Sequence, residues 1–284
     1  MLRLTNSEVH IIMGNTHAIA KKSTFIKKHP TLHIQNYAGN SYSAAGYKKT
    51  GYNSGKSASL NELRGKFYIK EPGSAITHFI GMLMAMLAAV PLLIKAAKAP
   101  DRIHFAALGI FALSMILLYG ASATYHSIRG SQRVQTILRK IDHMMIFVLI
   151  AGSYTPICLV VLNGTTGYVM LALVWGIAIA GIVIKLCWIT CPKWFSSILY
   201  IAMGWVCLLA FSKIYNALSG PAFYWLLSGG LIYTIGGVIY ALKAQGFNAR
   251  HSSFGSHEIF HLFVMGGSIC HFVLMFRYIT VFPI

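Results

Sequence analysis

Seven long apolar segments contain most of the chain after residue 73. Each segment is close to the roughly 20 residues that an α-helix needs to cross the hydrocarbon core of a bilayer. Segments of this kind fold as helices, because backbone groups without hydrogen bonds are too costly in lipid. The sequence therefore predicts an all-α fold, a polytopic seven-transmembrane helix bundle. The predicted spans are Ser74–Ile94, His104–His126, Ile141–Leu162, Tyr168–Trp188, Ser196–Tyr215, Phe223–Leu242 and His257–Val281.

The distribution of charge divides the chain into two parts. Only 11% of the 284 residues are charged, yet the formal net charge is +18. Residues 1–73 are rich in Lys, Ser, Asn and Gly without a sustained hydrophobic period, which predicts a basic, disordered cytoplasmic arm. Residues 74–284 form the predicted seven-helix transmembrane domain. We expect the arm to contact anionic lipid headgroups, and the lack of a basic–aromatic motif argues against a nucleic-acid partner.

Lysine and arginine residues in the short loops predict how the bundle is oriented. If the N-terminus is cytoplasmic, the inner loops contain more of these residues than the outer loops, as the positive-inside rule requires. The basic arm favours the same orientation. We therefore expect a multi-pass plasma-membrane protein with its N-terminus inside the cell and its C-terminus outside.

Several ionisable side chains lie inside the predicted spans, where each is costly and needs an explanation. Ser122 and His126 end the second span, four residues apart, so they share one helical face. Asp142 begins the third span, and His257 and His261, also four residues apart, begin the seventh. Because successive spans alternate in direction, all five residues lie toward the same side of the membrane. The sequence predicts that their side chains meet at one depth.

The types of these residues indicate a metal site. Three neutral imidazoles with an open fourth position suit catalytic zinc, which lowers the pKa of its bound water to near neutrality. We predict a Zn²⁺ site with His126, His257 and His261 as ligands. Asp142 is the predicted catalytic group that holds or deprotonates the water, and Ser122 would hydrogen-bond the water or the aspartate.

Other interpretations of the same residues stay open. Asp142 at a helix start can serve as an N-cap, and His126 alone can be an interfacial histidine. His257-Glu258-x-x-His261 is also the pattern of zinc metalloproteases, in which the glutamate is the general base. His271 lies about 21 Å beyond His257 along a helix and cannot bind the same ion. Cys187 and Cys191, one helical turn apart at the end of the fourth span, are predicted to be reduced thiols, and a metal-binding pair is the alternative.

The order of motifs along the chain resembles the hemolysin III group of the progestin and adipoQ receptor family. The resemblance covers about residues 70–284 and includes the Ser122, His126, Asp142, His257 and His261 set. Its further segments are residues 75–81 (AITHFIG), 141–143 (IDH), 151–156 (AGSYTP), 236–240 (GGVIY) and 254–261 (FGSHEIFH). The long basic arm and residues 70–73 depart from the pattern of that group.

The resemblance implies a seven-helix bundle in which His126, His257 and His261 hold zinc, with Asp142 and Ser122 beside the zinc-bound water. Eukaryotic relatives are credited with ceramidase-like hydrolysis, which implies a zinc-dependent membrane hydrolase acting on a lipid amide or ester. Some bacterial members are named for haemolysis, which implies a pore-forming protein of the bacterial inner membrane. A receptor or sensor with structural zinc is a third expectation, and an intramembrane protease ranks below these. Membrane lipids are the expected partners and substrates.

Overall fold

The computed structural model describes residues 34–35, 41–42, 69–99, 101–242 and 255–284. The chain divides into two units, Met1–Lys66 and Phe67–Ile284. In the first unit, two short strands, β1 (Ile34–Gln35) and β2 (Ser41–Tyr42), pair in antiparallel fashion. The arm expected at residues 1–73 lies almost entirely outside the described residues, and its disorder stays a prediction.

The second unit is built from helices. Seven of its helical segments are long and apolar enough to cross a membrane in the described part of the chain, which confirms the predicted fold class. The segments are α3 (Pro72–Ala97), α4 (Arg102–Ser127), α5 (Gln132–Pro156) with the π-helical turn η2 (Ile157–Val161), α6 (Gly164–Cys187), α7 (Lys193–Gly204) with the 3₁₀ turn η3 (Val206–Ala210) and α8 (Phe211–Ala217), α9 (Gly220–Leu242), and α11 (Ser256–Arg277) with the 3₁₀ turn η4 (Ile279–Val281). Which terminus faces the cytoplasm stays a prediction.

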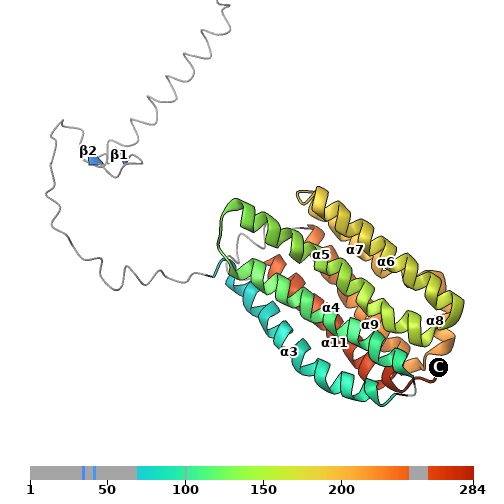
Figure 1. The fold of residues 1–284 in the computed structure, drawn as a ribbon. Helices are drawn as coiled ribbons and strands as arrows, with labels where there is room; N and C mark the ends of the chain where they lie inside the picture. The colour runs from blue at the N-terminus through green and yellow to red at the C-terminus, as the bar shows by residue number, and fades with distance from the viewer. Residues whose placement is uncertain (1–33, 36–40, 43–68, 100, 243–254) are drawn as a thin grey trace, which may run out of the picture. The chain divides into compact units, whose positions relative to one another are not determined.

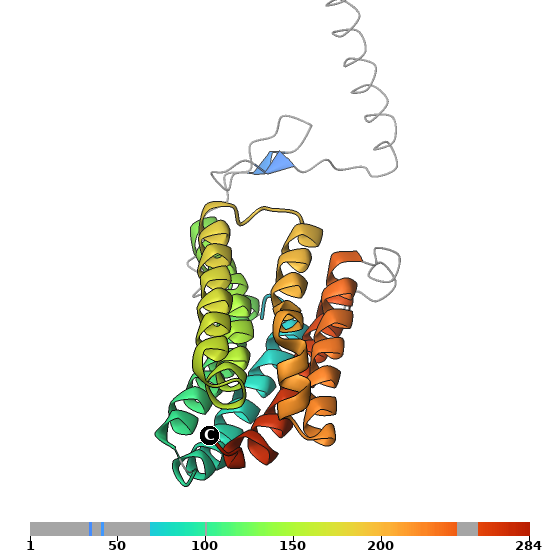
Figure 2. The same ribbon diagram turned by 90° about the vertical axis from the view of Figure 1, so that its right-hand side faces the viewer.

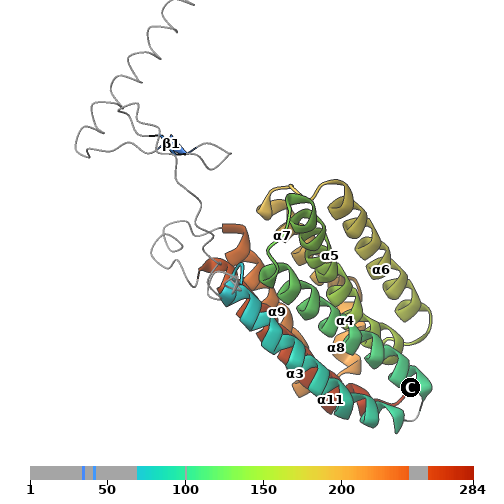
Figure 3. The ribbon, with the colours of Figure 1, turned by 60° about the vertical axis from the view of Figure 1, so that its left-hand side comes forward.

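The spans form a closed ring. Each span packs against the next along the chain, and α11 packs back against α3. Figures 1 and 3 both show α3 beside α11, although the two helices lie at opposite ends of the transmembrane sequence. The most buried spans are those of α4, α5 and α11, while the other four expose apolar side chains over most of their length. The ring therefore brings residues from α4, α5 and α11 together in its interior.

The fifth span is not one continuous helix. The α-helical pattern stops at Gly204, and the 3₁₀ turn η3 follows before α8. The hydroxyl of Tyr154 from α5 donates to the Gly204 carbonyl at 2.6 Å and accepts from the Cys207 amide at 2.8 Å. One side chain thus satisfies two backbone groups near the break, as the low dielectric of a membrane interior requires. This bridge positions Trp205 next to the interior of the ring.

A buried lysine lies near the loop that joins α6 to α7. Figure 2 shows this loop in yellow at the top of the bundle. Lys185 has an exposed fraction of 0%. Its amine donates to the Ser196 hydroxyl at 2.5 Å and to the Cys191 sulfur at 3.1 Å. Cys191 is one of five cysteines, all of which are free thiols. The cluster provides hydrogen-bond partners for a lysine that would otherwise be too costly to bury.

The Cys191 thiol is expected to ionise at a lower pH than an ordinary cysteine. Burial opposes its ionisation, but hydrogen bonds with Ser196 and Lys185, together with the charge of Lys185, outweigh burial and lower the pKa of Cys191. In protein where the other four cysteines are replaced by serine or alanine, the pH midpoint of alkylation by iodoacetamide should lie below the usual value of about 8.5. Lys185→Met should raise that midpoint. An unchanged midpoint in Lys185→Met would contradict this account.

Candidate metal centre

Three histidines from two helices meet at one end of the ring. His126 lies in the last turn of α4, and His257 and His261 lie in the first two turns of α11. One ring nitrogen from each can be chosen so that all three lie within 4.8 Å of one another, which makes the group able to hold a metal ion. The Nε2 atoms of His126 and His257 are 3.4 Å apart. Zinc–nitrogen bonds of 2.0–2.1 Å in a tetrahedral site separate two ligand nitrogens by about 3.3–3.4 Å, so this pair fits zinc.

Hydrogen bonds on the opposite ring edges orient two of the imidazoles. The Nδ1 atom of His126 lies 2.6 Å from Oε2 of Glu71, and Nδ1 of His261 lies 3.4 Å from the Thr77 hydroxyl. The Thr77 hydroxyl donates to the Gly73 carbonyl, so it can accept from His261. Both histidines then carry their proton on Nδ1, which leaves the Nε2 lone pair free for a metal.

Glu71 is a functional candidate that the sequence analysis did not identify. Its hydrogen bond with His126 is the main cause that lowers the pKa of the Glu71 carboxyl, with partial burial opposing it. The one available sequence signal is that an acidic residue directly precedes the first span in a chain with only six acidic residues. A carboxylate that accepts from a ligand histidine fixes its tautomer and raises its basicity.

We expect Glu71→Gln to weaken zinc binding by about 10–100-fold, the usual cost of losing such a carboxylate partner. Competition against a chelator of known zinc affinity measures the change. Asp101→Asn is the matched control, because Asp101 caps the start of α4, at the opposite end of that helix from His126. An equal loss in both variants would contradict a specific role for Glu71.

Glu258 does not have the position that a metalloprotease base needs. Its Oε1 accepts from the Ser74 hydroxyl at 2.7 Å, and its Oε2 accepts from the Gly255 amide at 2.8 Å. Both carboxylate oxygens therefore stabilise the start of α11 and its contact with α3. Glu258 is also not among the cavity-lining residues of the described chain. The structure thus places this glutamate in a capping role and not beside the histidines' open face.

Asp142 lies inside α5, which begins at Gln132 with Ser131 as its N-cap. The interpretation of Asp142 as a helix cap is therefore wrong, as is the predicted start of the third span at Ile141. The helix extends beyond the apolar run through a segment with three basic residues. Asp142 is buried, and the buried Ser122 lines the same cavity. Asp142 is not a member of the group of potential metal ligands.

A neighbouring histidine lies against the cluster without belonging to it. The ring of His78, from α3, stacks on His261 with ring centroids 3.6 Å apart. Neither ring nitrogen of His78 has a hydrogen-bond partner among the described residues. His78 thus packs against a candidate ligand.

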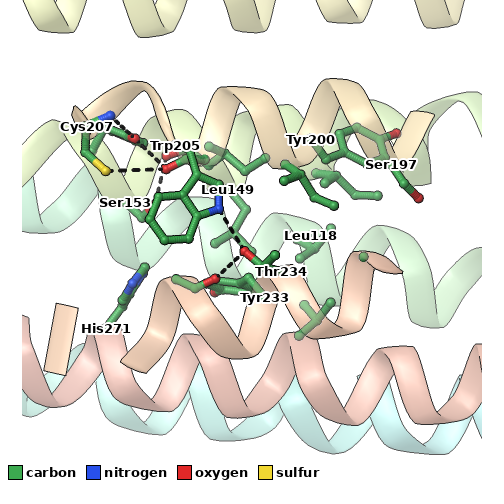
Figure 4. Close-up of a pocket in the computed structure, with 18 of the residues that line it drawn as sticks. Leu118, Leu149, Ser153, Ser197, Tyr200, Trp205, Cys207, Tyr233, Thr234 and His271 are labelled. Atoms are coloured by element: carbon green, nitrogen blue, oxygen red, sulfur yellow. Dashed lines mark hydrogen bonds between the residues drawn. The ribbon is translucent and has the colours of Figure 1, made fainter. Parts of the chain in front are cut away.

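The histidine cluster opens onto an internal cavity of about 180 Å³. Ser122, Asp142, His257 and His261 line one end of the cavity, while the buried His126 is not among its described lining residues. Along α5 the lining extends from Asp142 to Ile157, about 22 Å at 1.5 Å per residue. Figure 4 shows part of this wall, where Leu118 and Leu149 lie near Tyr233 and Thr234, and apolar residues such as Ile146, Ile150 and Phe223 also line the cavity. The cavity is thus long and mainly apolar, and the candidate metal ligands and Asp142 lie at one end of it.

The fold and this cluster define a class, a polytopic seven-helix membrane protein with a candidate metal centre inside one end of the bundle. The chain belongs to the hemolysin III family, because residues 67–272 match the family model described as Haemolysin-III related. It is 39% identical over 218 residues to a protein named Hemolysin-3 homolog from Bacillus subtilis (strain 168), covering 76% of this chain and 98% of that relative. It is 36% identical over 214 residues to Hemolysin-3 from Bacillus cereus, covering 75% of this chain and 94% of that relative. These findings confirm the resemblance and identify a multi-pass bacterial membrane protein.

Proposed function

We propose that this protein is a zinc-dependent hydrolase that cleaves an amide or ester bond of a membrane lipid. The observation that carries the proposal is the juxtaposition of three clustered histidines with a buried aspartate at the end of a long apolar cavity. A lipid with its cleavable bond next to the histidines would place its chain along the cavity. The substrate would come from the surrounding bilayer.

The proposal assigns a role to each polar residue of the site. His126, His257 and His261 would hold the ion, and zinc bound there would polarise a carbonyl and make water nucleophilic near neutral pH. Asp142 accepts the proton of the attacking water and returns it to the leaving group, because it is the one acidic residue that lines the cavity in the described chain. Ser122, which lines the same end of the cavity, would orient the Asp142 carboxylate.

The apolar walls have two roles in this scheme. Van der Waals contacts between the walls and the lipid chain hold the lipid in register with the site, because a chain that comes from the bilayer is already out of water. The walls also exclude bulk water, so the hydrogen bonds and charges at the histidine end act in a low dielectric. A site that cleaves lipids needs both a long apolar cavity for the chain and polar catalytic groups at one end of that cavity.

The test is release of fatty acid or amine from a panel of acyl amides and acyl esters by full-length protein in lipid nanodiscs. We expect turnover of at least one lipid class, its loss when a chelator removes zinc, and its recovery when zinc returns. Turnover that is unaffected by zinc removal would contradict the proposal. So would a zinc-loaded, folded protein that cleaves no member of the panel.

A second candidate is a pore-forming protein, which the name Hemolysin-3 of a relative favours. The mainly apolar cavity argues against a water-filled pore, because conduction needs a polar lining. Dye leakage from liposomes separates the two functions. Leakage that persists in His126→Ala and His261→Ala proteins would support the pore, and intact liposomes would support the hydrolase.

A further inference from the structure

A chain of three hydroxyl groups lies deeper in the bundle than the histidine cluster. The Tyr119 hydroxyl of α4 donates to Ser268 of α11 at 2.6 Å, and the Ser268 and Tyr233 hydroxyls are 2.8 Å apart. A serine hydroxyl has one hydrogen and two acceptor lone pairs. Because Ser268 already accepts from Tyr119, it can donate its own hydrogen to Tyr233. The hydroxyl hydrogen of Tyr233, a residue that lines the cavity, is then free for another acceptor.

His271 lies next to this chain and has an unused acceptor. Its Nε2 atom lies 3.4 Å from the Leu226 carbonyl, which can only accept, so the proton belongs on Nε2. The Nδ1 atom is then an acceptor, and it is buried without a partner among the described residues. The residue is 8% exposed and lines the cavity. An unpaired polar atom in this position is costly, so it calls for a donor from a ligand.

The backbone opposite His271 is shaped to admit its ring. A Cβ atom at Gly229 of α9 would overlap the Cδ2 and Nε2 atoms of His271. The imidazole therefore packs directly on a glycine, with its Nε2 edge against α9. The rings of His271 and Tyr233 lie edge to face with centroids 5.4 Å apart. The two rings are thus direct neighbours in the wall of the cavity.

We propose that Tyr233 and His271 form a polar subsite that binds a hydroxyl group on the chain of the lipid substrate, a proposal that rests on the proposed function. A hydroxyl group matches the pair because it can accept from the Tyr233 hydroxyl and donate to Nδ1 of His271. Figure 4 shows both side chains in the cavity together with Ser153 and Thr234. His271 lies ten residues beyond His261 on α11, about 15 Å along the helix. The subsite therefore selects lipids with a hydroxyl partway along the chain, at a distance from the cleaved bond.

The test compares stearic acid with stearic acids that carry one hydroxyl group at successive positions. Each acid displaces a fluorescent fatty acid from full-length protein in nanodiscs. Two hydrogen bonds at an otherwise unpaired site should make the best mid-chain hydroxy acid bind about tenfold tighter than stearic acid. Tyr233→Phe, which removes a single oxygen atom, and His271→Phe should each abolish most of this preference, measured as the ratio of the affinities for the hydroxy acid and for stearic acid. Tyr224→Phe, on the exposed face of α9, is the matched control and should keep the preference.

The binding test is independent of catalysis. The His257→Ala protein should lose zinc and turnover but keep the preference for the hydroxy acid. The subsite can therefore be tested even if the proposed hydrolase activity is not found. If His271→Phe does not fold, the Tyr233→Phe protein alone decides the result. Equal binding of stearic acid and all hydroxy acids would overturn the proposal. A preference that survives in Tyr233→Phe would overturn it as well.

Discussion

Replacing any one of His126, His257 and His261 by alanine should reduce the zinc content from about one ion per chain to a small fraction of that value. Two imidazoles alone hold zinc far more weakly than three, and no fourth protein ligand lies in the group among the described residues. Protein loaded with zinc, then passed through a desalting column, gives the metal content by mass spectrometry. Thermal unfolding checks that each variant is folded.

His104→Gln is the matched control for the metal measurement. His104 lies near the other end of α4, where its ring nitrogens contact the carbonyls of Asp101 and Phe282. Its replacement should keep the zinc even if the thermal stability falls. Wild-type protein that is folded and binds no zinc, or a His257→Ala protein with undiminished zinc, would contradict the predicted site.

Asp142→Asn should reduce lipid turnover by about 10²–10⁴-fold, the usual contribution of a positioned general base. Asparagine keeps the size of the side chain, but it cannot take a proton from water. Zinc content should stay near that of the wild type, because Asp142 is not a member of the histidine group. Single-turnover rates on the lipid found in the substrate panel give the measurement.

Asp101→Asn controls for loss of a carboxylate in general. Asp101 caps the first turn of α4 by accepting from the Ile103 amide, and asparagine caps a helix about as well. Turnover in Asp101→Asn should therefore match the wild type. If Asp142→Asn turns over at the wild-type rate while zinc is bound, Asp142 is not the base.

The spans were predictable because the length of an apolar run decides whether it crosses a bilayer. The same rule located Asp142 at a helix start, and this was wrong, since α5 continues through Arg133 and Arg139 to Gln132. Hydropathy locates the end of the apolar run that lies in lipid, and the helix itself can continue beyond that point. The break at Gly204 was not predicted either, because it depends on Tyr154 from another span.

The histidine cluster was predictable for a different reason. Spans of alternating direction bring the end of the second and the start of the seventh to one depth, so His126, His257 and His261 were expected together, and their ring nitrogens are close. Glu71 and Thr77 were not predicted because their partners lie 55 and 184 residues away along the chain. Only the packing of α3 against α4 and α11 reveals those contacts.

The closure of the ring by α11 against α3 sets an order of events during biosynthesis. The helix α11 is translated after the other six described spans and supplies His257 and His261, and its Glu258 accepts the hydrogen bond of Ser74 from α3. Chains are made from the N-terminus, so the early spans enter the membrane before these partners exist. Until α11 is inserted, Ser74 lacks its partner Glu258, and His126 lacks the two histidines of the cluster although Glu71 is already present. A chain cut short before α11 would therefore keep an unpaired Ser74 hydroxyl and an incomplete histidine cluster, which quality-control proteases can recognise.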